Sequence, residues 1–95
     1  DLRNPNKVYA LLRGFGGNHV RFHAADGTGY RFMAEQVLRL DAINPRVAAR
    51  VSRCFDRWRK FDAGRQSHAR AALETLREHQ GLSHDVAEIV ERALS

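Results

Sequence analysis

The feature that most constrains the fold is a pair of Asn-Pro dipeptides 40 positions apart, Asn4-Pro5 and Asn44-Pro45. Asparagine at an N-cap accepts hydrogen bonds from helix N–H groups, and proline suits the first helical position, so each dipeptide predicts a helix start. When one start is superimposed on the other, three pairs of apolar residues coincide: Val8 with Ala48, Leu11 with Val51, and Phe15 with Phe55. The chain therefore contains a repeat of about 40 residues.

Apolar residues recur at steps of three and four in five segments, which is typical of helices that bury one face. The expected helices span residues 5–15, 30–41, 45–58, 62–80 and 83–95. Asp62 and Ser83 are the expected N-caps of the last two, and Gly81 is expected to end the fourth. The third helix has the clearest apolar face: Val47, Ala48, Val51, Cys54, Phe55 and Trp58.

Two helices in each repeat of this length are typical of HEAT or armadillo stacking. We therefore predict one all-α domain over residues 1–95, with stacked antiparallel helix pairs in a HEAT/armadillo-like superhelix fragment of about five helices. Such arrays need roughly three or more repeats, so another repeat is expected before the first helix, and the chain is expected to be part of a longer protein. The apolar surface left there would promote self-association.

A long polar connection separates the first two expected helices. Within it, Asp26-Gly27-Thr28-Gly29 predicts a tight turn, and Phe22 is expected to insert into a groove, because connections of this length usually dock against the fold or carry function. His19 and His23 are four residues apart, but this spacing forms a metal-binding pair only on a helix, and no third ligand is nearby. We expect no zinc site here.

The remaining candidates for chemistry have simpler interpretations. His68, His79 and His84 are expected to be solvated, and the glycine-rich turns follow no predicted strand, so they lack the context of a nucleotide-binding loop. The carboxylates are scattered over Arg-rich helices, and no pair shares an apolar face where burial would raise a pKa. We expect no catalytic residue, metal site or cofactor in this chain.

Charge and cysteine usage suggest where such a chain could work. The net charge is +5 with a pI near 10.3, which favours an acidic partner of some kind. No apolar run approaches the ~20 residues that span a bilayer, so no membrane segment is expected. Cys54 is the single cysteine, which excludes an internal disulfide and fits a reducing compartment, so a cytoplasmic location is expected.

Four arginines follow one face of the expected third helix, at i, i+4, i+7 and i+11: Arg46, Arg50, Arg53 and Arg57. Like charges at this spacing repel by a few tenths of a kcal/mol per pair. Two interpretations follow: a solvated basic face partly offset by Asp56 and Glu74, or a surface that meets an anionic ligand.

Several segments in one register resemble the end of bacterial aminopeptidase N, and together they cover nearly the whole chain. They are Asn4-Pro5-Asn6-Lys7-Val8, Phe22-His23-Ala24-Ala25-Asp26-Gly27-Thr28-Gly29-Tyr30, Asn44-Pro45-Arg46-Val47-Ala48-Ala49-Arg50, Phe61-Asp62-Ala63-Gly64-Arg65-Gln66 and Arg70-Ala71-Ala72-Leu73. The second of these segments is the most specific.

The resemblance implies a zinc-dependent exopeptidase that removes N-terminal residues from peptides, with its zinc and general base in an upstream catalytic domain. In that family the C-terminal domain covers the catalytic domain and helps to enclose and orient the substrate. Arg50 matches an arginine of the family that faces the substrate cavity, and Arg46 lies one turn before it. Tyr9 occupies a position where relatives have another arginine, so the cavity lining would be less basic there.

A second hypothesis is a free-standing basic helical module that binds nucleic acid or an acidic protein. Binding to nucleic acid would weaken steeply with added salt. The aminopeptidase hypothesis instead requires a His-Glu-x-x-His motif upstream in the same reading frame. We favour the aminopeptidase.

Overall fold

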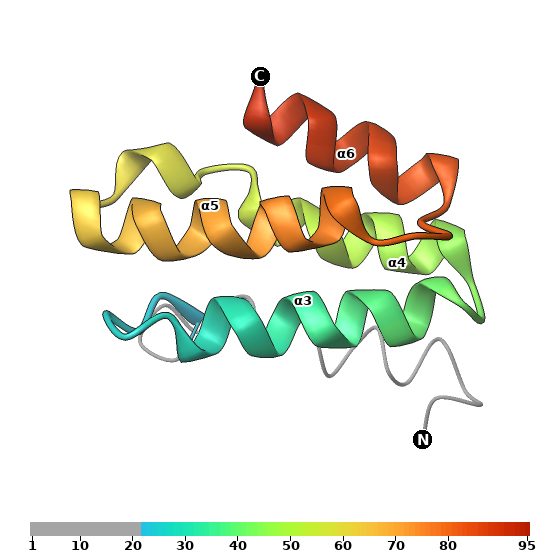
Figure 1. Ribbon diagram of the computed structural model, residues 1–95, viewed down its shortest axis with the longest axis horizontal. Coiled ribbons are helices and arrows are strands. Elements are labelled where there is room, and N and C mark those ends of the chain that lie inside the picture. The colour runs from blue at the N-terminus through green and yellow to red at the C-terminus, as the bar shows by residue number, and fades with distance from the viewer. Residues whose placement is uncertain (1–21) are drawn as a thin grey trace.

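The computed structural model describes residues 22–95, and their regular structure is entirely helical (Figure 1). The elements are α3 (Thr28–Asp41), α4 (Pro45–Ser52), the 3₁₀ helices η1 (Arg53–Phe55) and η2 (Trp58–Lys60), α5 (Ala63–Glu78) and α6 (His84–Leu94). No strand occurs in this part of the chain, and the all-α prediction is confirmed. The first expected helix, residues 5–15, lies outside the described residues.

The four α-helices of residues 22–95 form two layers, α3 with α5 and α4 with α6. Consecutive helices pack as antiparallel pairs, α3 with α4 and α5 with α6, and the pairs stack through α3–α5 and α4–α6 contacts (Figure 1). Each helix has an apolar face that is covered only when both kinds of contact form. This is the stacked-pair arrangement expected from the repeat.

The core lies between the layers and contains Phe22, as the sequence predicts. Phe22 is fully buried, and its ring meets those of Tyr30 and Phe55 edge-on, with centroids 5.1 and 5.4 Å apart. Edge-to-face aromatic pairs at these distances stabilise a fold beyond the area that they bury. Phe22 therefore anchors the connection before α3 to both layers.

Three predicted N-caps are confirmed. The side chains of Asn44, Asp62 and Ser83 accept hydrogen bonds from backbone N–H groups three residues ahead, at the starts of α4, α5 and α6. Each of these bonds satisfies a backbone donor that has no partner inside its helix. The helix starts are therefore fixed by local chemistry.

The third expected helix is shorter than predicted. It ends at Ser52 rather than near Trp58, and η1 and η2 follow. The segment after Ser52 includes Cys, Phe, Asp and Trp, which are modest helix formers. Its apolar periodicity predicted a continuous helix, but a long-range contact favours the shorter one. The Trp58 indole N–H donates to the Ala93 carbonyl of α6 at 2.9 Å.

Two other helix boundaries also differ from the expected ones. α3 begins at Thr28, because the Asp26 carboxylate accepts hydrogen bonds from the Thr28 N–H and hydroxyl at 3.0 and 2.8 Å. The expected turn therefore ends at Gly27, whose φ is +81°. α5 ends at Glu78, three residues before Gly81.

Cys54 is half-buried against the core. Burial raises the pKa of its thiol far above the ordinary value, and the negative charge of Asp56 raises it further. Because the thiolate is the reactive form, we expect native Cys54 to react with iodoacetamide at pH 8 at least about tenfold more slowly than the urea-unfolded chain. Mass spectrometry over time gives both rates, and equal rates would contradict the prediction.

Candidate functional site

Two of the site residues predicted from sequence lie on α4. Arg46 and Arg50 are one helical turn apart, and both side chains are exposed. Neither has an ion pair with any residue between 22 and 95, whereas the neighbouring Arg53 pairs with Asp56 at 3.5 Å. We call the surface formed by Arg46, Arg50 and Arg53 the α4 basic face; two of its three charges have no ion pair within residues 22–95.

The four arginines do not form one continuous row. Arg57 lies beyond the end of α4, between η1 and η2, with φ −105° and ψ 20°. Glu74, which the sequence suggested as a compensating charge, lies on α5 and pairs with Arg70 at 3.5 Å and Arg77 at 3.8 Å. That part of the solvated-face interpretation is wrong, because α4 contacts α3 and α6 whereas Glu74 lies on α5. Tyr9, the third candidate, lies outside the described residues.

His23 has a structural partner that the sequence did not predict. Its Nδ1 lies 2.6 Å from the Tyr30 hydroxyl, and its ring stacks on Phe61 with centroids 4.0 Å apart. Burial raises the pKa of the Tyr30 phenol, which is therefore neutral near pH 7 and can donate to Nδ1. The Arg65 guanidinium donates to the His23 carbonyl at 2.6 Å and to Asp62 at 2.7 Å. These contacts hold the connection before α3 onto the start of α5.

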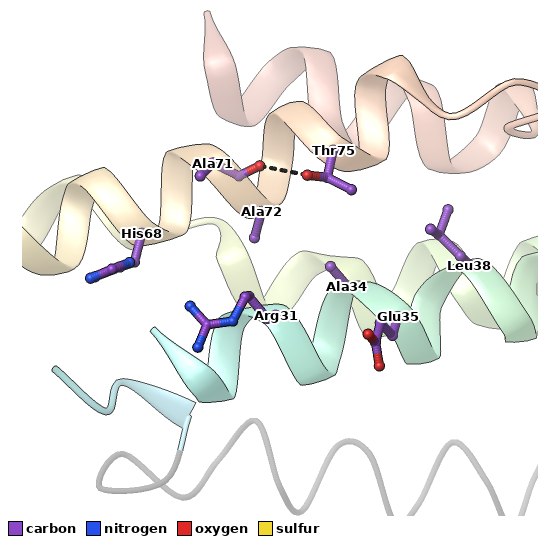
Figure 2. Close-up of a pocket in the computed structure, with 8 residues that line it drawn as sticks. All are labelled: Arg31, Ala34, Glu35, Leu38, His68, Ala71, Ala72 and Thr75. Atoms are coloured by element: carbon purple, nitrogen blue, oxygen red, sulfur yellow. Dashed lines mark hydrogen bonds between the residues drawn. The ribbon is translucent and has the colours of Figure 1, made fainter. Parts of the chain in front are cut away.

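A groove of about 230 Å³ lies between α3 and α5 (Figure 2). Arg31 and His68 lie near one end of it, and Leu38 lies at the other (Figure 2). It is lined by Arg31, Ala34, Glu35, Leu38, His68, Ala71, Ala72 and Thr75. The sequence did not predict this groove, which alanines from both helices line.

His68 differs from the solvated side chain expected of it. It is half-buried on α5 and packs over Gly27, so closely that a Cβ on Gly27 would lie 2.6 Å from His68 Cγ and Nδ1. The side chain thus closes one end of the groove. His79 and His84 are exposed, as predicted.

Within residues 22–95, no group of three or more His, Cys, Asp or Glu side chains could hold a metal ion. None of the helices described there is long and apolar enough to cross a membrane. Two features of the described surface could bind a ligand: the arginines of α4 and the α3–α5 groove.

Comparison with known proteins gives one consistent result. A family model described as "Domain of unknown function (DUF3458_C) ARM repeats" matches residues 1–95. The chain is 41% identical to aminopeptidase N of Escherichia coli (strain K12) over 95 residues and 39% identical to that of Haemophilus influenzae over 95 residues. Each alignment covers 99% of this chain and 11% of the relative.

A solved structure agrees with the sequence matches. The crystal structure of Legionella pneumophila aminopeptidase A in complex with aspartic acid superposes with a TM-score of 0.89 at 39% identity, covering 99% of this chain and 11% of that one. The similarity to the C-terminal part of aminopeptidase N predicted from the sequence motifs is confirmed, and so is the armadillo-like class. The chain spans about a ninth of the length of these relatives.

Proposed function

Because the chain belongs to the DUF3458_C family of ARM-repeat domains, we propose that it works as a non-catalytic C-terminal domain of a zinc aminopeptidase. The observation that carries the proposal is the 39–41% identity to aminopeptidase N along nearly the entire chain. The zinc ion and general base would be supplied by an upstream catalytic domain, since residues 22–95 contain no ligand set. The lone thiol fits a cytoplasmic location, which is part of the proposal.

Within that enzyme, we propose that the domain covers the catalytic domain and helps to enclose and orient the peptide substrate. The support is the α4 basic face, where Arg46 and Arg50 project from a capped helix with no ion pair in the described part of the chain. A guanidinium stays charged near neutral pH and binds a carboxylate or a peptide carbonyl in a forked geometry. Tyr9 is the third candidate for the cavity lining.

The 95-residue chain by itself is expected to hydrolyse no aminoacyl substrate, with or without added zinc. Hydrolysis needs a metal-bound water or another activated nucleophile, and the described residues contain no group of side chains that could hold a metal ion. Release of a chromogenic leaving group from the purified chain gives the answer. Zinc-dependent turnover that copurifies with the chain would refute the non-catalytic role.

Arg50→Ala in the full-length enzyme is expected to lower kcat/KM for peptides about fivefold, or about 1 kcal/mol. A desolvated charge-assisted contact is worth about 1.5–3 kcal/mol, but water in an open cavity screens it. Chromogenic substrates with a single residue should lose less, because only peptides extend beyond the cleaved bond. Steady-state kinetics on both substrate classes measures the difference.

Arg77→Ala provides the matched control for this test. Arg77 is also an exposed arginine, but it lies on α5, in the other layer from α4, where it pairs with Glu74. Its replacement should leave kcat/KM unchanged for both substrate classes. If Arg50→Ala and Arg77→Ala behave alike in folded enzyme, Arg50 belongs to a solvated face and the cavity assignment is wrong.

A further inference from the structure

The groove between α3 and α5 lies in the layer that does not contain the α4 basic face, so the proposed function does not use it (Figures 1 and 2). Its apolar surface comes from both helices. Ala34 and Ala72 are buried, and Leu38 is half-buried at one end. A ligand lying there would bury an apolar part of its own against these side chains.

Charged groups of opposite sign line the same groove. Arg31 and Glu35 lie one turn apart on α3, yet the guanidinium and carboxylate form no ion pair with each other. Arg31 uses one N–H to donate to the Asp26 carbonyl at 3.2 Å, which leaves further donors on the same guanidinium. Glu35 makes no hydrogen bond or ion pair with any residue between 22 and 95.

Two further polar groups affect the Arg31 end of the groove. His68 lines it without a hydrogen bond to any described residue, so an imidazole N–H is available there. The Asp26 carboxylate lies nearby and attracts Arg31, but it accepts hydrogen bonds from Thr28 and forms no ion pair with the guanidinium. The negative charge of Asp26 thus offsets part of the positive charge of Arg31, and the guanidinium can still bind the carboxylate of a ligand.

The volume of the groove limits the size of its ligand. At about 230 Å³ it is smaller than the ~300–1,000 Å³ of pockets that hold drug-sized molecules, which suits one residue rather than a peptide. We propose that the groove binds a free α-amino acid with an aliphatic side chain. Its carboxylate meets Arg31 and His68, its ammonium group meets Glu35, and its side chain lies over Ala34 and Ala72 toward Leu38.

A zwitterion suits this lining better than an ion of either sign. A simple anion would satisfy Arg31 and be repelled by Glu35, and a simple cation would do the reverse. A ligand that carries both charges compensates both side chains, and an α-amino acid carries them on one α-carbon. An aminopeptidase releases free amino acids, so the groove would respond to product; that consequence alone rests on the proposed function.

The test is a titration of the ¹⁵N-labelled 95-residue chain with L-leucine, followed by amide chemical shifts. We expect saturable shifts for residues that line the groove, with a dissociation constant on the order of 1–10 mM for so small and partly solvated a ligand. L-Leucinamide lacks the carboxylate, 4-methylpentanoate lacks the ammonium group, and glycine lacks the side chain. Each should bind at least about fivefold more weakly.

Variants on α3 and α5 distinguish binding of L-leucine in the groove from a general effect of the charge of the chain. Arg31→Gln and Glu35→Gln should each weaken L-leucine binding about fivefold or more. Arg39→Gln and Glu78→Gln, on exposed positions of α3 and α5 outside the groove, should leave it unchanged. Glu35→Gln breaks no hydrogen bond or ion pair between described residues, so it should not disturb folding, which circular dichroism checks.

Two results would overturn the proposal. One is the absence of saturable shifts up to about 50 mM L-leucine in the folded chain. The other is binding that Arg31→Gln and Glu35→Gln leave as strong as in the unaltered chain. Because no peptide is hydrolysed in this experiment, its outcome is separate from that of the Arg50 test.

Discussion

Gly27→Ala is expected to lower the free energy of unfolding by about 3 kcal/mol, for two separable reasons. The backbone at Gly27 has φ +81°, in the left-handed region, where a side chain costs about 1–2 kcal/mol. The new Cβ would also lie 2.6 Å from His68 Cγ and Nδ1 and 2.8 Å from His68 Cβ. Rotation of His68 cannot move its own Cβ, so α5 has to shift, which adds about 1–3 kcal/mol. Urea unfolding followed by circular dichroism measures the sum.

Gly81→Ala isolates the backbone contribution. Gly81 has φ +92°, and a Cβ there would meet nothing within 4 Å, so this substitution should cost only about 1 kcal/mol. The steric contribution can be tested with His68→Gly, which removes both the ring and the Cβ. In the His68→Gly background, Gly27→Ala should lower the free energy of unfolding by no more than Gly81→Ala does. The glycine at position 68 itself destabilises α5, but the double-mutant cycle subtracts that cost. Equal losses for Gly27→Ala with and without His68 would show that the close contact has no energetic effect.

The features predicted correctly from the sequence are those that depend on neighbouring residues. The caps by Asn44, Asp62 and Ser83 each need only a side chain and an N–H group three residues ahead. Each Asn-Pro start is likewise a local signal, and its recurrence after 40 positions was enough to predict stacked helix pairs. Phe22 was identified as an inserted side chain because a connection of this length usually docks against the fold or carries function, and Phe22 is buried.

The features that the sequence did not predict depend on contacts between distant residues. α4 ends early because Trp58 bonds to the Ala93 carbonyl, and Arg59 donates to the carbonyls of Leu94 and Ser95 beside it. Helical periodicity continues through Trp58 and contains no sign of either contact. The groove was equally hidden, because it depends on how α3 and α5 align. The position of His68 over Gly27 likewise follows from packing and not from a motif.

The clearest of these long-range contacts joins Asp41, at the end of α3, to Ser83, before α6. The Ser83 N–H donates to Asp41 Oδ2 at 2.9 Å, and the Ser83 hydroxyl donates to Oδ1. The same hydroxyl oxygen accepts from the Val86 N–H as the cap of α6. A carboxylate at the C-terminus of its own helix is unfavourable, but here it lies at the N-terminus of α6, where negative charge is stabilised. Asp41 therefore links the two layers at the site of one helix start.

Asp41→Ala is expected to lower the free energy of unfolding by about 2–4 kcal/mol. Asp41 is only 8% exposed, and its loss leaves the Ser83 N–H and hydroxyl without their acceptor in a partly buried position. Hydrogen bonds to charged groups are worth about 1.5–3 kcal/mol each, although two bonds to one carboxylate do not add fully. Asp41→Asn should cost about 1–2 kcal/mol, since an amide retains one acceptor but turns a donor toward Ser83. Urea unfolding of both variants measures these losses.

Asp85→Ala serves as the control that separates hydrogen bonding from the charge of a carboxylate near the start of α6. Asp85 is exposed in the first turn of α6, so its removal tests the helix dipole alone and should cost less than about 1 kcal/mol. In a Ser83→Ala background the loss from Asp41→Ala should fall by about 1–2 kcal/mol, because the hydroxyl bond is already absent while the N–H bond remains. Two results would show that only the charge of Asp41 stabilises α6. One is a loss of free energy of unfolding from Asp41→Ala no larger than that from Asp85→Ala, and the other is an equal loss from Asp41→Ala with and without the Ser83 hydroxyl. The two layers would in that case be held together by apolar packing without this polar link.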